Sequence, residues 1–408
     1  MPSARVHDEA GIVFIRPTSC GENGFATSVH LQIHSTCQNI RLNQREDTVV
    51  EIASQPISIR KSLFNMKYTP AIASMSLGRA WIHDFEKKMK AASTSGFQGM
   101  EIFYEDLEYF AKSLNPSVDQ NATPSPTQLV TAAKKVKTIC DQNGLKIIGL
   151  QPFLFYEGLR DRQQHAHLIE KLHVWFDIVD ALDTDIIQIP ANFLPEDQIT
   201  GDMDTIVADM VEVADLGLKR TRPIRFAYEN LCWSTYIDTW DALWEVVQRV
   251  DRSNFGMCLD TFNIAGRVWA DPAAATGMVD GAEAALDASL EKLVKTVDIA
   301  KVFYIQVVDA ERVDPPLDDK HPFHAEGQPS RMSWSRNARC FIYETDRNAY
   351  LPVERVARAI IEGLGYEGYV SMELFSRTLT EPGVDVPESH AQRGIKAWEK
   401  FADALNLK

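Results

Sequence analysis

Short apolar runs alternate with longer amphipathic segments along most of this chain. Runs such as Phe255–Leu259 have few polar positions, which is typical of strands covered on both faces of a parallel sheet. Segments such as Asp161–Ala181 repeat apolar residues at helical spacing and therefore predict amphipathic helices. This alternation of strand and helix patterns predicts an α/β fold with a parallel sheet.

The pattern predicts eight strands, each followed by a helix. The expected strands are Ala71–Met75, Gly99–Phe103, Lys146–Gln151, Asp185–Ile189, Arg225–Glu229, Phe255–Asp260, Val302–Gln306 and Tyr369–Phe375. The expected helices are Asp84–Ser95, Glu105–Leu114, Thr127–Asn143, Asp161–Ala181, Met203–Lys219, Thr239–Val250, Ala284–Thr296, Pro352–Gly363 and His390–Leu405. Eight such repeats are the count of a (β/α)8 TIM barrel. A doubly wound open sheet is the alternative, but the chain contains no P-loop pattern.

Residues 1–65 do not follow this pattern. They contain short apolar pieces, such as Ile12–Ile15, but no helical period and no repeating unit. We therefore expect a poorly defined N-terminal extension over residues 1–65 and a single barrel domain over residues 66–408. Within the barrel, the polar segments Asn115–Pro126 and Asp309–Tyr350 are expected to be loops.

Composition narrows the class of protein. With 408 residues, 45% of them hydrophobic, the chain can bury a large core and exceeds the roughly 250 residues of a typical barrel. The net charge of −15 argues against nucleic-acid and anionic-membrane partners, and it favours a small-molecule substrate. Six cysteines without CxxC spacing, and no apolar stretch long enough to span a membrane, favour a cytoplasmic protein with reduced thiols. Homo-oligomer formation stays open.

Oxygen-bearing side chains stand at the ends of four consecutive predicted strands. They are Glu229, Asp260, Gln306 and Glu373. In a barrel these ends meet at the face where TIM-barrel enzymes keep their active sites. Each acid alone is more often an ion-pair or capping residue, but three converging carboxylates repel one another unless a cation lies among them. Oxygen ligands suit a divalent ion such as Mg²⁺ or Mn²⁺.

At these residues the sequence resembles the xylose isomerase-like barrels, which include sugar and sugar-phosphate isomerases and epimerases. The motifs are Tyr228-Glu229-Asn230, Leu259-Asp260-Thr261-Phe262, Tyr304-Ile305-Gln306 and Ser371-Met372-Glu373. Within this superfamily the chain resembles fungal 3-dehydroshikimate dehydratases of quinate catabolism, through the segments Ala73–Gly78, Gly99–Asp106, Leu150–Phe153, Phe262–Arg267, His324–Pro329 and Trp334–Arg339. The likeness covers about Met66–Phe401.

The resemblance implies a lyase that converts 3-dehydroshikimate to protocatechuate in quinate and shikimate catabolism. It also implies a divalent cation, Mg²⁺, Mn²⁺ or Co²⁺, held by the residues Glu229, Asp260, Gln306 and Glu373. Many relatives have His at the position of Gln306, and many have Asp-x-x-His where this chain ends the motif with Asn263. Glutamine remains an oxygen ligand, whereas asparagine cannot act as a general base, so the role of that histidine does not carry over.

The implied chemistry asks for a base and for a cationic partner of the substrate. Removal of the C6 proton of 3-dehydroshikimate gives a dienolate, and loss of the C5 hydroxyl then leads to an aromatic ring. The candidate catalytic residues are Glu229, Glu373 and His324, with Tyr104 as a further candidate base. The expected substrate contacts are Arg79, Glu101, Tyr104, Arg267 and Arg312, of which Arg79 and Arg267 are the first candidates to bind the substrate carboxylate.

Three other functions compete with the lyase. A sugar or sugar-phosphate isomerase or epimerase would keep the same metal site, with Glu229 and Glu373 moving a proton across a ketose, but the loop sequences favour the lyase. A DNA-repair endonuclease of similar shape needs a histidine-rich site and a basic groove, and a non-catalytic binding barrel leaves the ligand set unexplained. The histidines His165, His167 and His173 lie on one predicted helix at spacings that do not converge, so we expect packing or surface roles for them.

Overall fold

The computed structural model describes residues 6–7, 13–14, 67–115 and 122–407. The chain divides into two compact units, Met1–Asn65 and Met66–Lys408. In the first unit the described residues are two short antiparallel strands, β1 (Val6–His7) and β2 (Val13–Phe14). The rest of the expected N-terminal extension lies outside the described residues.

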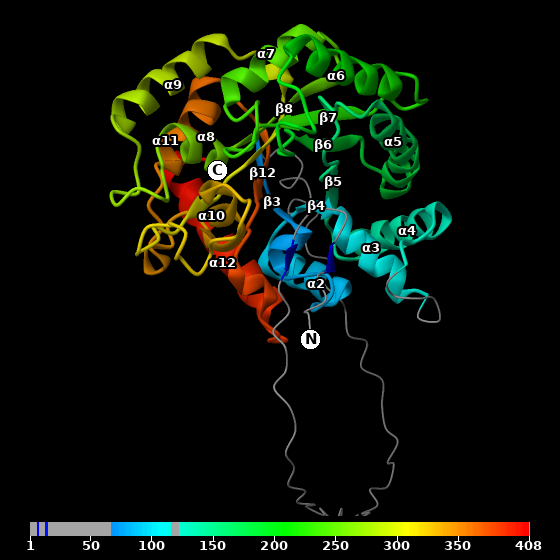
Figure 1. The fold of residues 1–408 in the computed structure, drawn as a ribbon. Helices are drawn as coiled ribbons and strands as arrows, with labels where there is room; N and C mark the ends of the chain where they lie inside the picture. The colour runs from blue at the N-terminus through cyan, green and yellow to red at the C-terminus, as the bar shows by residue number, and fades with distance from the viewer. Residues whose placement is uncertain (1–5, 8–12, 15–66, 116–121, 408) are drawn as a thin grey trace, which may run out of the picture. The chain divides into compact units, whose positions relative to one another are not determined.

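The second unit is a closed barrel of eight parallel strands, which confirms the predicted TIM barrel (Figure 1). In barrel order the strands are β3 (Tyr68–Ala73), β4 (Gly99–Phe103), β5 (Lys146–Gln151), β6 (Ile186–Pro190), β7 (Arg225–Glu229), β8 (Phe255–Asp260), β9 (Val302–Gln306) and β12 (Gly368–Met372). Strand β12 pairs with both β9 and β3 and so closes the barrel. Each predicted strand overlaps an observed one, because a strand buried on both faces leaves an apolar run that the sequence displays.

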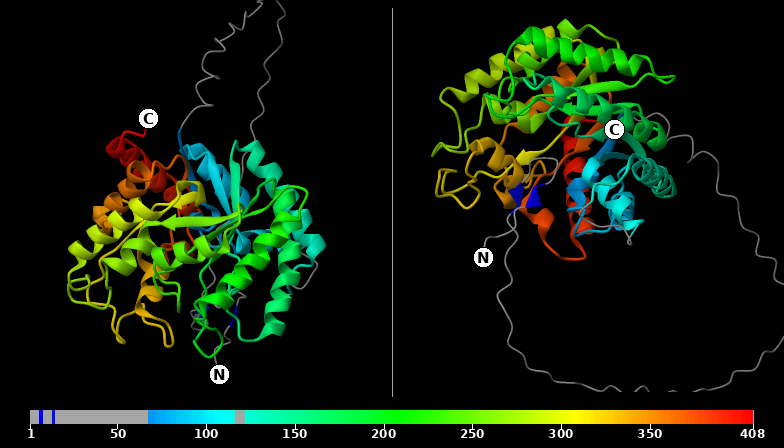
Figure 2. Two further views of the ribbon diagram at one scale, coloured as in Figure 1. Left: turned by 90° about the horizontal axis from the view of Figure 1, so that it is seen from above. Right: turned by 45° about the vertical axis from the view of Figure 1, so that its right-hand side comes forward.

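Helices surround the strands, as the two further views show (Figure 2). They are α2 (Phe85–Ser95), α3 (Tyr104–Ser113), α4 (Pro126–Gln142), α5 (Arg162–Leu182), α6 (Met203–Leu218), α7 (Trp240–Val250), α8 (Thr261–Val268), α9 (Ala282–Thr296), α10 (Ser330–Ala338), α11 (Val353–Arg358) and α12 (Val386–Leu405). Short helical turns are η2 (Ser74–Leu77), η3 (Ile299–Lys301), η4 (Thr345–Arg347), η5 (Ala359–Gly363) and η6 (Arg377–Thr380). Several helices begin at a side-chain cap, for example α2 at Asp84 and α5 at Asp161, whose carboxylates accept backbone N–H groups of the first turn.

One prediction about the connections is wrong, and one helix was not predicted. The segment Asp309–Tyr350 is not a plain loop, since it contains α10 and a hairpin of β10 (Asp309–Ala310) with β11 (Arg339–Cys340). Helix α8 was not predicted, because it follows β8 without a break and its residues are almost all buried, so no polar face marks it. The expected loop Asn115–Pro126 ends where Ser125 caps α4, and residues 116–121 lie outside the described residues.

The interior of the barrel changes character along the strands. One layer is apolar and consists of Ala71, Ile148, Ile186, Ala227, Cys258 and Tyr304. Nearer the carboxyl ends of the strands, the buried side chains are polar: Glu101, Gln151, Gln188, Glu229, Asp260 and Gln306. Burying polar groups is costly unless they are paired, so this polar layer points to a function rather than to stability.

Two shifts of strand register occur beneath the polar layer. Between β8 and β9, Met257 lies opposite Val302 but the next residue, Cys258, lies opposite Tyr304. Phe303 is therefore left without an opposite residue, and Gln306 comes to lie beside Asp260. A second shift, between Met100 and Glu101 of β4, changes the pairing with β5 in the same way. Such irregularities are common beside active sites, where they redirect a side chain.

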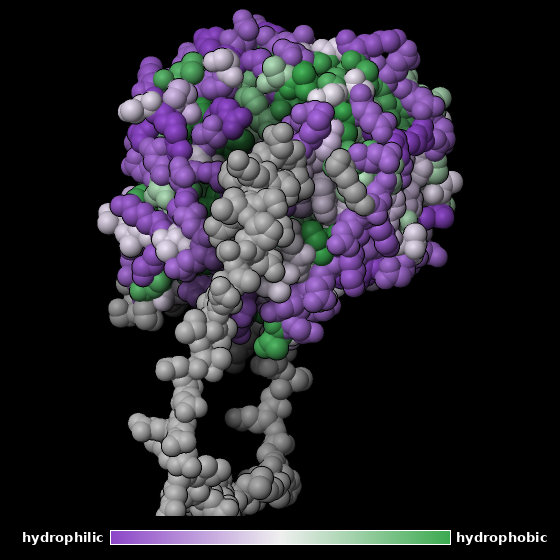
Figure 3. All heavy atoms as spheres, turned by 180° about the vertical axis from the view of Figure 1, so that it is seen from behind, coloured by the Kyte–Doolittle hydropathy of each residue, from purple (hydrophilic) through white to green (hydrophobic). Residues whose placement is uncertain are grey.

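On the face of the barrel unit drawn in Figure 3, hydrophilic side chains predominate. Among the described residues, the exposed large hydrophobic side chains are Trp81, Ile82, Leu218, Val294 and Val384. Within the described part of the chain, no helix has the length and apolar character needed to cross a membrane.

Candidate metal centre

Three carboxylates converge at the carboxyl ends of the barrel strands. Glu229 ends β7, Asp260 ends β8, and Glu373 directly follows β12. Each offers an oxygen atom within 4.8 Å of the others, and none of the three is more than 3% exposed. The structure therefore brings together three of the four residues that the sequence nominated as metal ligands.

The electrostatics of this cluster favour a cation. Burial raises the pKa of Glu229 well above its ordinary value, and the charges of Glu373 and Asp260 raise it further. Burial likewise raises the pKa of Glu373 to about 8 and raises that of Asp260. Three buried carboxylates that resist ionisation are poor structural residues but good ligands for a divalent cation, which would offset their repulsion.

Gln306 supplies a fourth oxygen. It lies beside Asp260 in the strand register, and its Nε2 donates to the two carboxylate oxygens of Glu101 at 3.0 and 3.3 Å. Its Oε1 is buried and has no hydrogen-bond partner among the described residues. An unsatisfied buried oxygen on the residue beside Asp260 fits a divalent cation that takes oxygen ligands, so the donor set suits the implied metal.

Two amides hold the carboxylates in place. Asn263 Nδ2 donates to Glu229 Oε1 at 2.9 Å and to Asp260 Oδ2 at 2.7 Å. The orientation of this amide is fixed because Asn263 Oδ1 accepts the backbone N–H of Cys232 at 3.0 Å. Gln188 Nε2 donates to the other oxygen of Glu229. Asn263 therefore orients two candidate ligands, a role that its position in the motif did not reveal.

A buried arginine completes the site. Arg339, in β11, is 1% exposed, and its Nη1 donates to Asp260 Oδ2 at 2.9 Å and to Glu373 Oε2 at 3.2 Å. Its guanidinium carbon lies 4.1 Å from the ring centre of Phe262 and 5.2 Å from that of Phe375. The sequence did not single out Arg339, because it lies in the polar segment predicted as a loop. Arg339 comes close to Phe262 and Phe375 only in the folded structure. Its position in the sequence therefore did not indicate that it lies in the site.

The predicted arginine contacts have partners other than the three carboxylates of the cluster. Arg79 is 2% exposed, forms an ion pair with Glu105 at 3.8 Å and lies over the ring of Trp81. The Arg267 Nε lies 2.5 Å from Asp238 Oδ2. The Arg312 Nη2 donates to the Ala275 carbonyl at 3.1 Å. Each of these guanidinium groups thus has a protein partner of its own.

The remaining predicted residues are divided between the site and its surroundings. Glu101 lies inside the barrel, in contact with Gln306. Tyr104 stacks on Trp175 of α5 with a ring separation of 4.9 Å. The backbone N–H of His324 donates to the carbonyl of His321, and within the described structure no hydrogen bond or ion pair joins His324 to the carboxylates.

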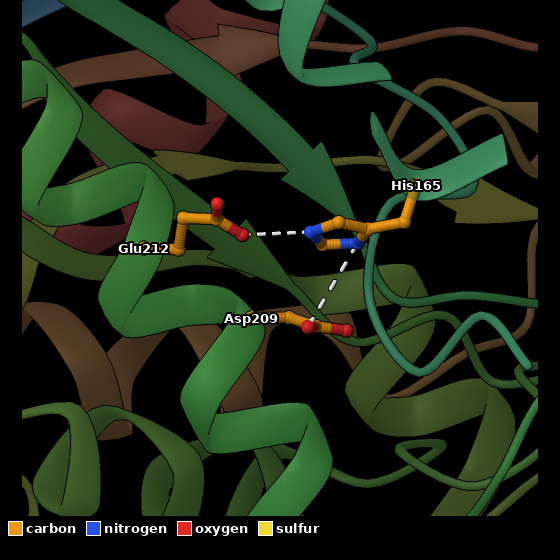
Figure 4. A group of neighbouring side chains, drawn as sticks. All are labelled: His165, Asp209 and Glu212. Atoms are coloured by element: carbon orange, nitrogen blue, oxygen red, sulfur yellow. Dashed lines mark hydrogen bonds and ion pairs between the residues drawn. The ribbon is translucent and has the colours of Figure 1, made fainter. Parts of the chain in front are cut away.

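A second group of potential ligands lies between α5 and α6 (Figure 4). The buried His165 ring has Nε2 2.7 Å from Glu212 Oε2 and Nδ1 3.8 Å from Asp209 Oδ1. Both oxygens of Asp209 are already engaged, since Arg162 donates to them at 2.8 and 3.2 Å and the Gly158 N–H donates at 2.9 Å. We therefore interpret this group as an ion-pair network that joins two helices, in agreement with the packing role expected for His165.

Comparison with known proteins agrees with the fold. Residues 89–401 match the model of the xylose isomerase-like TIM barrel family. The chain is 49% identical to a 3-dehydroshikimate dehydratase of Neurospora crassa, over 83% of this chain and 94% of that protein. It is 25% identical to a 3-dehydroshikimate dehydratase of Pseudomonas aeruginosa over 75% of this chain, and it spans only 38% of that longer protein.

Among solved structures, the IOLI protein with a bound zinc atom has the same fold. The TM-score is 0.57 at 15% identity, over 83% of this chain and 98% of that one.

Proposed function

This chain belongs to the xylose isomerase-like TIM barrel family, and within it to the 3-dehydroshikimate dehydratases. We propose that it converts 3-dehydroshikimate to protocatechuate with the help of a divalent cation. The likeness to the Neurospora enzyme over almost the whole of both proteins carries the choice of substrate. The carboxylate cluster alone would also suit a sugar isomerase.

The residues that would hold the cation are Glu229, Asp260, Gln306 and Glu373, and our candidates for it are Mg²⁺, Mn²⁺ and Co²⁺. When bound, such a cation supplies a Lewis acid that stabilises negative charge developing on the substrate carbonyl oxygen.

The chain itself must move a proton. In the proposed reaction a base takes the proton from C6 of the substrate, the electron pair forms a ring double bond, and the C5 hydroxyl leaves as water after it gains a proton. Enolisation of the resulting dienone gives the aromatic product. We assign the proton transfer to a carboxylate of the cluster, with Glu229 and Glu373 as candidates, since both are buried beside the site. His324 remains the candidate outside the cluster.

The anionic substrate also needs a cationic contact. All four arginines have protein partners, but those of Arg79, Arg267 and Arg312 are Glu105, Asp238 and Ala275, outside the carboxylate cluster, whereas those of Arg339 are Asp260 and Glu373 within it. We therefore propose Arg339 as the residue that binds the substrate carboxylate. A planar guanidinium matches a carboxylate in two parallel hydrogen bonds, which gives orientation as well as affinity.

The test is a direct assay. Purified protein mixed with 3-dehydroshikimate should develop the ultraviolet absorption of protocatechuate, without any organic cofactor. A chelator should abolish the reaction, and Mg²⁺, Mn²⁺ or Co²⁺ should restore it. Asp260→Asn and Glu373→Gln should lower turnover strongly, whereas Glu212→Gln in the network between α5 and α6 should not.

Absence of aromatic product, together with interconversion of a ketose and its epimer, would overturn the proposal in favour of an isomerase.

A further inference from the structure

We propose that Glu101 is a positioning residue of the metal centre, whose carboxylate orients the Gln306 amide so that its oxygen, and not its nitrogen, faces the cation. This inference rests on the proposed metal site and adds a residue that does not itself bind the cation.

Glu101 lies in β4, at the level of the polar layer in the barrel interior, and is 1% exposed. Both of its carboxylate oxygens lie within hydrogen-bond distance of Gln306 Nε2, at 3.0 and 3.3 Å. The two residues are 205 positions apart in the chain, and β4 and β9 are not neighbours in the barrel, so the contact crosses the interior.

Two further donors point at the same carboxylate. Gln151 Nε2, from β5, donates to Glu101 Oε2 at 2.8 Å, and the Ser371 hydroxyl, from β12, donates to Oε1. When Glu101 is ionised, its carboxylate can only accept hydrogen bonds, so every partner must present an N–H or an O–H group to it. Glu101 therefore acts as one acceptor that sets the direction of three side chains from three strands.

For Gln306 this acceptor decides which end of the amide faces the cation site. If the amide turned over, its oxygen would face the oxygens of Glu101, and a buried N–H group would lose its partner. In the observed orientation Nε2 is satisfied by Glu101, and the buried Oε1 is the atom without a partner among the described residues. The orientation that satisfies Glu101 is thus also the orientation that offers an oxygen ligand.

The chemistry of the ligand explains why such a residue is needed here. A carboxylate binds a cation through either of its equivalent oxygens, so turning it over changes nothing. An amide has two ends of nearly the same shape, and only the oxygen binds a cation. Groups that hydrogen-bond to a metal ligand commonly change metal affinity by about 10- to 100-fold when they are removed.

The experiment measures metal binding without substrate. Mn²⁺ affinity of the purified full-length protein is determined by electron paramagnetic resonance or calorimetry for the wild type and for Glu101→Met, which leaves no oxygen to accept from Gln306. We expect about 10- to 100-fold weaker binding in the variant, with circular dichroism that matches the wild type. The matched control is Glu157→Met, which removes another buried carboxylate whose pKa burial also raises to about 7, and its Mn²⁺ affinity should stay within about twofold of wild type.

A double-mutant cycle separates orientation of Gln306 from a general effect of charge. In a Gln306→Ala background, Glu101→Met should have no further effect on Mn²⁺ affinity, because the amide to be oriented is gone. An equal loss in both backgrounds, or unchanged affinity of the single Glu101→Met variant, would overturn this inference while leaving the proposed function intact. A wild-type protein that binds no Mn²⁺ would overturn both proposals.

Discussion

Arg339 lies fully buried among two acids and two aromatic rings. A guanidinium in that position offsets part of the charge of Asp260 and Glu373 and, at the same time, shares these carboxylates with any cation that binds there. The residue therefore has two expected effects of opposite sign: it supports binding of an anionic substrate, and it weakens binding of a metal.

Arg339→Met tests both effects. Loss of a charge-assisted contact worth about 1.5–3 kcal/mol should lower kcat/KM by roughly 10- to 150-fold, mainly through KM. Mn²⁺ affinity should not fall, because a competing positive charge has been removed. Steady-state kinetics and metal titration provide the two measurements.

Arg393→Met is the matched control for Arg339. Arg393 also binds a carboxylate, Glu344, and lies over a phenylalanine ring, Phe341, but on α12. Arg393→Met should leave kcat/KM and Mn²⁺ affinity close to the wild-type values. If Arg339→Met lowered Mn²⁺ affinity by a larger factor than kcat/KM, the assignment of Arg339 to substrate binding would be contradicted.

The candidate ligands illustrate how far residue-level reasoning reaches. Glu229, Asp260, Gln306 and Glu373 were recognisable because each ends an apolar run, which is a local property of the sequence. Asn263 was recognised only as a residue that cannot be a base, since its bridge between two carboxylates depends on how β7 and β8 lie side by side. Arg339 ends the segment Trp334–Arg339 that carries part of the resemblance, but its contact with Asp260 spans 79 positions of the chain, and no local pattern assigns it a role in the site.

At the scale of elements, the shift of register between β8 and β9 brings Gln306 beside Asp260. It requires room for Phe303, which has no opposite residue, and Gly256 provides that room. A Cβ atom at Gly256 would lie 2.3 Å from the Lys301 carbonyl oxygen and 2.7 Å from the Phe303 ring. The sequence displays the two strands but not their relative register, because pairing is set by such contacts between strands.

Gly256→Ala should therefore disturb both stability and the site. Overpacking should lower the free energy of unfolding by about 1–3 kcal/mol, and displacement of β9 should weaken Mn²⁺ binding at least several-fold. Urea unfolding and metal titration measure the two effects.

Gly144→Ala is the comparison, since Gly144 has a φ of +67° and open space around it. That variant should lose stability through backbone strain and keep its Mn²⁺ affinity. Unchanged metal affinity in Gly256→Ala would show that the register does not depend on this glycine.

Helix α12 is attached to the barrel through His390. Its Nδ1 donates to the Ser76 carbonyl at 2.9 Å, and its Nε2 lies 3.1 Å from the Thr378 hydroxyl, an arrangement that suits the neutral ring. Burial, with a contribution from the charge of Arg393, lowers the pKa of His390 from 6.5 to about 4. The unfolded chain therefore binds a proton at this histidine before the folded protein does.

The sign of the pH effect follows. As the pH falls from about 6.5 to about 4, His390 should reduce the free energy of unfolding by up to about 3 kcal/mol, and His390→Gln should show a shallower loss over that range. Urea unfolding at pH 7 and at pH 4.5 measures the difference. His167→Gln, at an exposed position of α5, should lose free energy of unfolding with falling pH as steeply as the wild type. An equally steep loss in His390→Gln would contradict the role of His390.

At the scale of the whole molecule, the carboxylates of the candidate metal site link stability to pH in the opposite direction. Burial raises the pKa of Glu373 from 4.5 to about 8, and raises that of Glu229, so the folded metal-free protein keeps protons that the unfolded chain releases. Raising the pH from about 4.5 to about 8 should therefore destabilise the metal-free protein through these groups.

A bound cation should remove this destabilisation at high pH. The increase in Tm that Mn²⁺ produces should be larger at pH 7.5 than at pH 5.5, because protons and the cation compete for the same oxygens. Thermal unfolding with Mn²⁺ and with a chelator measures it at each pH. Asp260→Ala should abolish the increase at both values, and an increase independent of pH would contradict the linkage.

The division of the chain at residues 65 and 66 leads to a further expectation. All eight barrel strands lie within Met66–Lys408, and the first contact of the barrel's closing pair is between the Gly368 N–H and the Lys67 carbonyl. A chain shortened to begin at Met66 should keep the Tm and kcat/KM of the full chain. A chain beginning at Phe85 lacks β3 and should not yield folded protein. If the chain beginning at Met66 also failed to fold, residues 1–65 would have a structural role.

The pairing of β12 with β3 also has a consequence for biosynthesis. Strand β3 is made early, and its partner β12 follows roughly 300 residues later. Because a ribosome adds about 5–20 residues per second, one edge of β3 stays unpaired for roughly 15 to 60 s. An open strand edge invites pairing with other chains. That edge of β3 is therefore exposed to foreign strands until β12 is made and pairs with it.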